Sequence, residues 1–229
     1  MQGALGKVSI VIPCYNEEKT IAETVNELSK LKDRLDLEII VVDDGSSDGT
    51  FHIVSGLSGV RLQRHEQNKG KGAAVMTGAA MAKGDVIVIQ DADMEYDPKE
   101  IPALVEPIFR NECDVVYGSR FRGKIAGMTF SHYVGNRVLS YFTSLFFGAQ
   151  ITDMMTGHKA FKAKIFKGLD LKSRRFDFEL EVTVKTLRKG YTINEIPIVY
   201  SKRQFGEAKI RWTDGVKSMI QLFKYRIGF

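Results

Sequence analysis

The sequence predicts an α/β fold in which a mixed, mostly parallel sheet is flanked by helices on both faces. Short runs of β-branched residues alternate with segments whose apolar residues recur every three or four positions. Such alternation is typical of parallel sheets. Clusters of Asp, Asn, Gly and Lys follow four of the predicted strands. Each cluster alone is as typical of a turn as of a binding site. Together they predict a site at one rim, because ligands in such sheets bind outside the carboxyl ends of the strands.

The first half of the chain contains the regular part of this pattern. The predicted strands cover residues 8–12, 37–42, 60–64, 86–90 and a segment around 115–116. The helices predicted between them cover residues 17–31, a short segment from position 48, 72–82 and 98–109. Gly84 follows the third helix as a C-terminal glycine signal. Asp97 and Pro98 are typical of an N-cap followed by proline at the first helical position.

The second half has longer amphipathic segments. Residues 128–150 are predicted to be helical with a wide apolar face, and helices are also expected at 176–189 and 213–226. Residues 191–200 are predicted to form a strand. Pro197 places that strand at a sheet edge, because proline cannot donate to the hydrogen-bond ladder.

Composition narrows the function classes. The chain has 229 residues, 44% apolar and 27% charged, which is typical of a soluble globular protein with one sizeable domain. Cys14, Cys113 and the four histidines show no zinc or disulfide spacing, which fits a reducing compartment. No apolar run is long enough to predict a membrane span, and no signal peptide is expected. The net charge of +5 favours anionic partners. Nucleic acid is not expected, because the basic residues lie in separate loops.

Four acids at alternate positions follow the strand predicted at 86–90: Asp91, Asp93, Glu95 and Asp97. Two carboxylates roughly 5 Å apart repel by about 3 kcal/mol at an effective dielectric of about 20. Water, a helix N-terminus or a metal ion would offset this repulsion. An Asp-x-Asp pair at a strand end is typical of a Mg²⁺ or Mn²⁺ site, because these ions prefer oxygen ligands and bridge to substrate phosphates.

Several segments occur in an order and spacing that indicate a family. The first four are VSIVIPCYNEE, IIVVDDGSSDGT, NKGKGAA and VIQDADMEYDP, and the later ones are YGSRF, GNR, ITDMMTGHKAF, FDFELEV and EIPIVYSKRQFGEAKI. The first four resemble the N-terminal half of an inverting family 2 glycosyltransferase with the GT-A (Rossmann-like, nucleotide-diphospho-sugar transferase) fold. The later ones resemble its dolichyl-phosphate mannose and dolichyl-phosphate glucose synthase-like branch. The resemblance covers residues 8 to about 215.

The resemblance implies a donor site. The residues implied to bind the nucleotide sugar are Pro13, Tyr15, Glu17, Asp44, Lys71 and Asp91. Tyr15 would stack on the base, and Asp44 would accept a hydrogen bond from the edge of the base. A divalent metal, Mg²⁺ or Mn²⁺, is implied on the donor diphosphate, with Asp91, Asp93 and Glu95 as its ligands.

The resemblance also implies catalytic and acceptor residues. Arg203 and Lys209 would neutralise phosphate charge and close over the donor, and would act in catalysis with Asp91 and Asp93. The family usually has serine where this chain has Ala208. Arg120 and Arg137 would bind the acceptor phosphate, for which the planar guanidinium is suited.

The implied activity is an inverting, metal-dependent transfer of mannose or glucose from GDP-mannose or UDP-glucose to a polyprenyl (dolichyl or undecaprenyl) phosphate. A single GT-A domain would span residues 1–229, with the donor bound by about 1–118 and the acceptor by about 119–229. A phosphate monoester is mostly dianionic near pH 7, so it needs cations and not a general base. We expect the enzyme to be peripheral at the cytoplasmic face of a membrane. The apolar side chains of 128–147 would lie at the bilayer surface, pack on the sheet, or do both.

Two alternatives stay open at this point. One is a family 2 transferase that acts on a hydroxyl of a glycan or another non-lipid acceptor, with Asp153 or Asp177 as general base or, as we favour, in a structural or orienting role. The other is a nucleotide-binding module without catalysis. A homo-oligomer is also left open.

Overall fold

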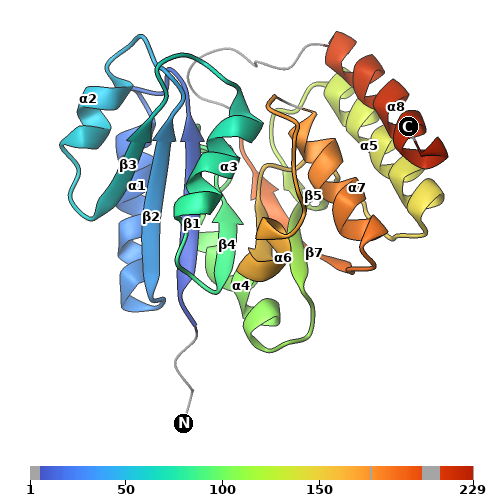
Figure 1. Ribbon diagram of the computed structural model, residues 1–229, viewed down its shortest axis with the longest axis horizontal. Coiled ribbons are helices and arrows are strands. Elements are labelled where there is room, and N and C mark those ends of the chain that lie inside the picture. The colour runs from blue at the N-terminus through green and yellow to red at the C-terminus, as the bar shows by residue number, and fades with distance from the viewer. Residues whose placement is uncertain (1–5, 176, 203–211, 229) are drawn as a thin grey trace.

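The computed structural model describes residues 6–175, 177–202 and 212–228 (Figure 1). Within these ranges, strands form one seven-stranded sheet in the order β3-β2-β1-β4-β6-β5-β7. The strands are β1 (Val8–Cys14), β2 (Leu37–Asp43), β3 (Val60–Arg64), β4 (Val86–Ile89), β5 (Val115–Ile125), β6 (Lys159–Lys162) and β7 (Ile193–Tyr200). Neighbours pair in parallel except β6, which is antiparallel to β4 and β5. The prediction of a mixed, mostly parallel sheet is confirmed.

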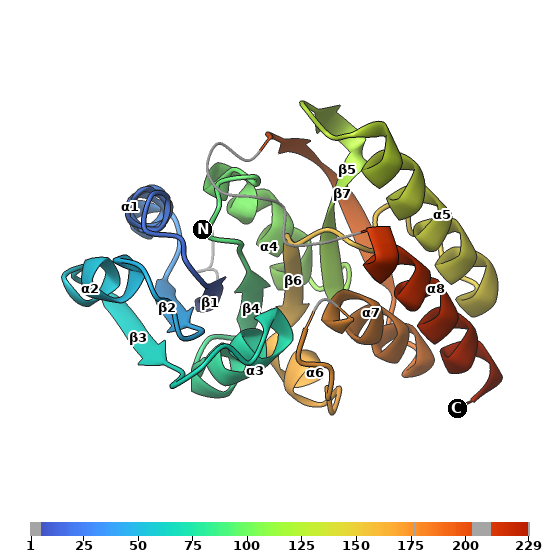
Figure 2. The ribbon, with the colours of Figure 1, turned by 90° about the horizontal axis from the view of Figure 1, so that it is seen from above.

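Helices cover both faces of this sheet. They are α1 (Ile21–Ser29), α2 (Thr50–Ser55), α3 (Lys71–Met81), α4 (Ile101–Phe109), α5 (Phe130–Phe147), α6 (Ala163–Lys167), α7 (Phe178–Arg188) and α8 (Trp212–Ile227), with short 3₁₀ turns at Lys30–Asp33 and Pro98–Glu100. Figure 2 shows α1 and α4 on one face, α3, α6 and α7 on the other, and α5 and α8 side by side beyond α7.

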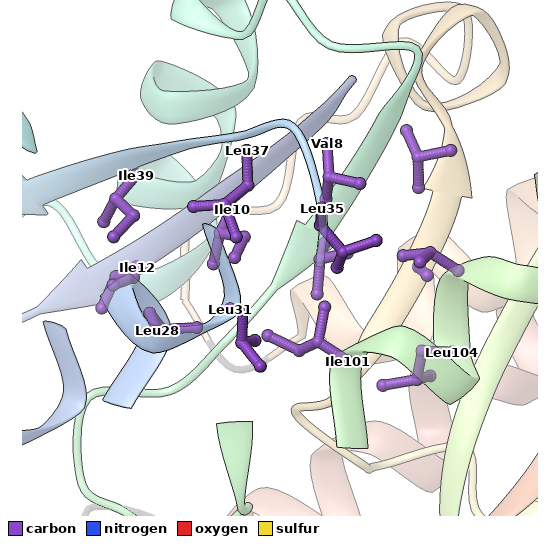
Figure 3. Close-up of a cluster of buried hydrophobic side chains, with 14 of the residues drawn as sticks. Val8, Ile10, Ile12, Leu28, Leu31, Leu35, Leu37, Ile39, Ile101 and Leu104 are labelled. Atoms are coloured by element: carbon purple, nitrogen blue, oxygen red, sulfur yellow. The ribbon is translucent and has the colours of Figure 1, made fainter. Parts of the chain in front are cut away.

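Two apolar clusters fill the space between sheet and helices, because successive strand residues face opposite sides. On one side, Ile10 and Ile39 pack with Leu28 of α1 and Ile101 of α4 (Figure 3). On the other side, a second cluster joins the sheet to α3 and α7; it includes Val11, Ile40, Ile87, Val75 and Phe178. Each fully buried Ile or Leu contributes about 1.5–3 kcal/mol relative to an exposed one. The clusters therefore hold the strand ends in fixed positions.

The predicted elements lie at their expected places, with three differences. Strand β5 continues to Ile125, well beyond the segment predicted around 115–116. The helix predicted from position 17 begins at Ile21 and ends in the 3₁₀ turn Lys30–Asp33. The antiparallel strand β6 and the short helix α6 were not predicted at all. The sequence of β6 is KAFK, and the lysine at each end breaks the apolar pattern that would indicate a strand. Its first residue, Lys159, is nevertheless fully buried. Pro197 lies in β7, which forms one edge of the sheet, as expected. Asp97 accepts a hydrogen bond from Lys99 N, as an N-cap does.

Candidate active site

The residues that follow β1, β2 and β4 line a cavity of about 840 Å³. The predicted site residues that line it are Pro13, Tyr15, Glu17, Asp44, Lys71, Asp91, Asp93, Glu95 and Arg120. The prediction that polar clusters meet at one rim of the sheet is therefore confirmed. The cavity continues to Asn136 and Leu139 of α5 and to Ser218 and Met219 of α8.

The loop after β1 is held against the loop after β2. Asn16 has a φ of 55°, in the left-handed region that asparagine tolerates, and its N–H donates to Ser46 Oγ at 2.9 Å. The N–H of Glu17 donates to Thr50 Oγ1 at 2.8 Å. These bonds fix the backbone from which Tyr15 and Glu17 reach the cavity.

Asp44 ties the loop 65–70 to the end of β2. Its side chain is nearly buried and accepts hydrogen bonds from Lys69 N at 2.9 Å and Gly70 N at 2.7 Å. The Nδ1 atom of His65 lies 2.6 Å from Asp44 Oδ1. The contact between Asp44 and a base stays a prediction, but the carboxylate is held in place at the cavity wall before any ligand binds.

Lys71, the first residue of α3, forms ion pairs with Asp91 at 2.7 Å and with Glu179 at 3.0 Å. Burial alone would lower the pKa of Lys71, but the two carboxylates raise it above its ordinary value. The other oxygen of Glu179 accepts from the fully buried Lys159, which also donates to Thr156 O. Glu179 is thus the shared counter-charge of two lysines. Sequence reasoning assigned it no role, although it lies in the FDFELEV segment.

The three acids predicted to hold a metal all line this cavity. Glu95 N donates to Asp93 Oδ1 at 3.2 Å, and Asp91 Oδ1 pairs with Lys71. In the described ranges, no three His, Cys, Asp or Glu side chains gather closely enough to hold a metal by themselves. The oxygen donors still fit Mg²⁺ or Mn²⁺, because these ions often take one or two carboxylates and obtain their other ligands from water and substrate phosphates. The three-residue ligand set stays a prediction.

The Asp91 carboxylate lies directly against Gly157. A Cβ added at Gly157 would be 2.0 Å from Asp91 Oδ2, so no other residue fits here unless an atom moves. The N–H of Gly157 donates to Tyr96 Oη at 3.1 Å, and burial raises the pKa of Tyr96. Sequence reasoning missed both residues; the glycine in ITDMMTGHKAF was the available signal for Gly157.

Arg120 is nearly buried in a bidentate ion pair with Asp153. Its Nε and Nη2 atoms donate to the two carboxylate oxygens of Asp153, each at 2.7 Å, and its N–H donates at 3.0 Å. Glu195 accepts from Asp153 N at 2.9 Å. Asp153 therefore orients Arg120, which agrees with the orienting role expected from the sequence.

Arg137, on α5, is exposed and is not among the described residues that line the cavity. Its guanidinium carbon lies 5.3 Å from the centre of the Phe121 ring, and that of Arg120 lies 5.8 Å from the same ring. The structure thus brings the two predicted acceptor residues to one aromatic side chain. Their binding of a phosphate stays a prediction.

Helices α5 and α8 expose apolar side chains beside the cavity. The apolar face of α5 and α8 consists of Phe130, Tyr133, Val134, Val138, Tyr141, Leu145, Ile220, Phe223 and Ile227. On its other side α5 buries Leu139, which packs with Leu180 of α7. The helix therefore packs against the domain with one side and exposes apolar groups with the other. Among the helices that the structure describes, none has the length and apolar character to cross a bilayer.

Arg203, Ala208 and Lys209 lie outside the described residues. Their predicted roles therefore stay predictions.

Comparisons with known proteins identify similar sequences and a matching family. Residues 9–169 match the family model described as Glycosyl transferase family 2. A dolichol-phosphate mannosyltransferase of Pyrococcus furiosus is 32% identical over 90% of this chain, which spans 59% of that protein. A UDP-N-acetylglucosamine--dolichyl-phosphate N-acetylglucosaminyltransferase of Methanococcus voltae is 33% identical over 83% of this chain and 84% of its own length.

Solved structures show the same fold. Glucosyl-3-phosphoglycerate synthase from Mycobacterium tuberculosis, in complex with Mn²⁺ and UDP-glucose, superposes with a TM-score of 0.77 at 23% identity. The match covers 98% of this chain and 80% of that one. The same enzyme in complex with phosphoglyceric acid also has a TM-score of 0.77. The GT-A fold class predicted from the sequence is confirmed.

Proposed function

We propose that this chain, which belongs to glycosyl transferase family 2 and is a glycosyltransferase, moves a hexose from a nucleotide diphosphate to a polyprenyl phosphate. The donor would be GDP-mannose or UDP-glucose, and the lipid dolichyl or undecaprenyl phosphate. The names of two relatives at 32% and 33% identity, both of which refer to dolichyl phosphate, support this acceptor class.

One observation carries the proposal: a single cavity joins the residues expected to bind the donor to the two helices with exposed apolar side chains. Tyr15, Asp44 and Asp91 line one part of it, and Asn136 of α5 and Ser218 of α8 line another. A substrate with a charged head and an apolar tail fits this arrangement. A soluble sugar would not need the exposed apolar face.

A divalent metal on Asp91 and Asp93 would supply charge stabilisation for the leaving diphosphate. The Mn²⁺ and UDP-glucose bound by the glucosyl-3-phosphoglycerate synthase support this assignment. Lys71, held between Asp91 and Glu179, adds a fixed positive charge on the same wall of the cavity. Arg203 and Lys209 are proposed to cover the diphosphate from the following loop.

The transfer we propose is a single displacement. An oxygen of the acceptor phosphate attacks the anomeric carbon, and the bond from that carbon to the diphosphate breaks. The bond's electron pair leaves with the nucleoside diphosphate. The anomeric centre inverts, so an α-linked donor gives a β-linked lipid phosphate sugar. No proton has to move, because the phosphate is mostly dianionic near neutral pH.

The positions of the two carboxylates considered as general bases, Asp153 and Asp177, favour a phosphate acceptor. Both carboxylate oxygens of Asp153 accept hydrogen bonds from Arg120. Neither Asp153 nor Asp177 is among the described residues that line the cavity. The Asp177 carboxylate instead accepts from Arg175 N at 3.2 Å. A hydroxyl acceptor would need such a base.

We further propose that the apolar face of α5 and α8 rests on the membrane that contains the lipid. Burying about five such side chains, at roughly 1.5 kcal/mol each, suffices for reversible interfacial binding. The enzyme would then be peripheral at the cytoplasmic face of that membrane.

The test is a transfer assay with purified full chain, Mn²⁺ and radiolabelled GDP-mannose or UDP-glucose. Polyprenyl phosphate is compared with polyprenol of the same chain length and with soluble sugars. We expect labelled lipid only from the phosphate. Equal transfer to polyprenol or to a soluble sugar would support the hydroxyl-acceptor alternative, and nucleotide binding with no transfer would support the non-catalytic one.

A variant series locates the acceptor site. Arg137→Gln should lower kcat/KM for the lipid phosphate by about 10- to 100-fold, as expected for one lost hydrogen bond to a charged group. Arg110→Gln is the matched control, because Arg110 follows α4 and its side chain is 62% exposed. If the two variants behave alike, Arg137 does not bind the acceptor.

A further inference from the structure

The Asp44 carboxylate has most of its hydrogen-bonding capacity already in use. A carboxylate offers about four acceptor positions on its two oxygens. Oδ1 faces His65 Nδ1 at 2.6 Å and Lys69 N at 2.9 Å. Oδ2 accepts from Gly70 N at 2.7 Å. Within the described part of the chain, one position therefore remains for a ligand in the cavity, and it is on Oδ2.

His65 closes Oδ1 firmly, because its ring is fixed at both nitrogens. A carboxylate only accepts, so Nδ1 must carry the hydrogen that it donates to Asp44. Nε2 lies 3.0 Å from Thr77 Oγ1, on α3. The ring is nearly buried; Thr77 belongs to α3, which packs on the core, and Asp44 directly follows β2. It cannot turn away to free Oδ1 without losing both contacts.

The two donors that the proposed function leaves open differ in the edge of their base. Uracil presents a single N–H between two carbonyl groups. Guanine presents two N–H groups side by side, which match both oxygens of a carboxylate. Since Oδ1 of Asp44 is closed, guanine would leave one of its N–H groups without an acceptor, whereas the uracil N–H is satisfied by Oδ2. Asn68, which lines the same cavity, offers an amide that can donate to a uracil carbonyl.

We infer that the donor is a uridine diphosphate sugar and that His65 sets this preference by occupying one oxygen of Asp44. The inference rests on the proposed function, because it takes the cavity to be a nucleotide-sugar site. An unsatisfied buried donor reduces affinity by about 10- to 100-fold, and this is the expected ratio between UDP and GDP.

Isothermal titration of the full chain with UDP and with GDP, each with Mn²⁺, tests the inference. We expect UDP to bind about 10- to 100-fold more tightly. Equal or tighter binding of GDP would overturn the inference and leave the proposed transfer standing. If neither nucleotide binds, the proposed function fails together with the inference.

Variants at His65 test its specific role. His65→Ala frees Oδ1 and lets the Asp44 carboxylate present both oxygens, so the ratio of GDP to UDP dissociation constants should fall toward one. His65→Gln keeps an N–H donor near Asp44 and should retain the ratio. His52→Ala, at an exposed histidine of α2, is the control. If His65→Ala weakens both nucleotides equally, or if His65→Gln and His65→Ala give the same ratio, His65 does not set the preference. If His65→Ala folds poorly, His65→Gln decides alone. A ratio of GDP to UDP dissociation constants near one in His65→Gln would also overturn the role of His65.

Discussion

Gly157→Ala gives the most direct test of how the Asp91 carboxylate is positioned. The new Cβ would lie 2.0 Å from Asp91 Oδ2 and 3.1 Å from Tyr96 Cε2, whereas ordinary contacts begin at 3.4 Å. The carboxylate must therefore move by about 1.4 Å or the two segments must separate, at a typical overpacking cost of about 1–3 kcal/mol. A misplacement of about 1 Å at a reacting site lowers the rate by about 100-fold.

The expected result is a loss of about 100-fold in kcat/KM with the lipid phosphate acceptor, together with a 10- to 100-fold weaker Mn²⁺ affinity, on the order of what a lost supporting contact costs. Initial-rate measurements and Mn²⁺ titrations give the two values. The matched control is Gly56→Ala, where the nearest atom to the new Cβ is 3.5 Å away and the site is distant. If Gly157→Ala keeps both values within about threefold of the parent while remaining folded, the assigned contact does not position Asp91.

Three further predictions concern buried charge and the exposed helices. Burial lowers the pKa of His158 to about 3, so below its ordinary value of 6.5 the unfolded chain binds a proton that the folded chain does not. The free energy of unfolding should therefore decrease as the pH is lowered from 6.5 to about 3, by up to about 1.4 kcal/mol per pH unit, and His158→Phe should remove this contribution in urea titrations at several pH values. Arg120→Gln leaves Asp153 buried without its ion-pair partner and should lower the free energy of unfolding by about 3–5 kcal/mol in the same assay; a loss under 1 kcal/mol would contradict the pairing. Tyr141→Glu and Leu145→Glu change side chains that are 63% and 61% exposed, so they should leave the melting temperature unchanged and abolish sedimentation with anionic vesicles. Unchanged sedimentation would exclude this face as the membrane contact.

The first half of the fold was predictable because its signals are local. Strands β1, β2 and β4 each contain a run of β-branched residues, and Val86–Ile89 is buried at every position. Pro98 and Asp97 marked the start of a helix in the same local way. Strand β6 was not predictable, because Lys159 is buried only where the distant Glu179 neutralises it. A charge that is acceptable through a contact 20 residues away leaves no signal in the local pattern.

The site divides in the same way. Strand order alone brought Tyr15, Asp44 and Asp91 to one rim, so their meeting in one cavity could be predicted from topology. Residues in the second half of the chain position the side chains of site residues in the first half. Glu179 of α7 holds Lys71, and Gly157 leaves room for Asp91. These roles depend on packing between distant segments. They became visible only with the structure.

The charged side chains around Lys71 form one wall of the cavity, and their charge balance affects how a metal and a donor bind. Lys71 and Lys159 are matched by Asp91 and Glu179, so the four groups sum to no net charge. Asp93 and Glu95 are outside this sum, so a diphosphate alone would be repelled by their carboxylates. A divalent cation on these acids would remove the repulsion and attract the diphosphate, so the site should bind the two cooperatively. The dissociation constant for UDP should therefore rise at least tenfold when Mn²⁺ is removed with EDTA, and that of Mn²⁺ should rise by the same factor without UDP, because linkage is reciprocal. Titrations that find either affinity independent of the other ligand would mean that the metal and the diphosphate do not share this wall.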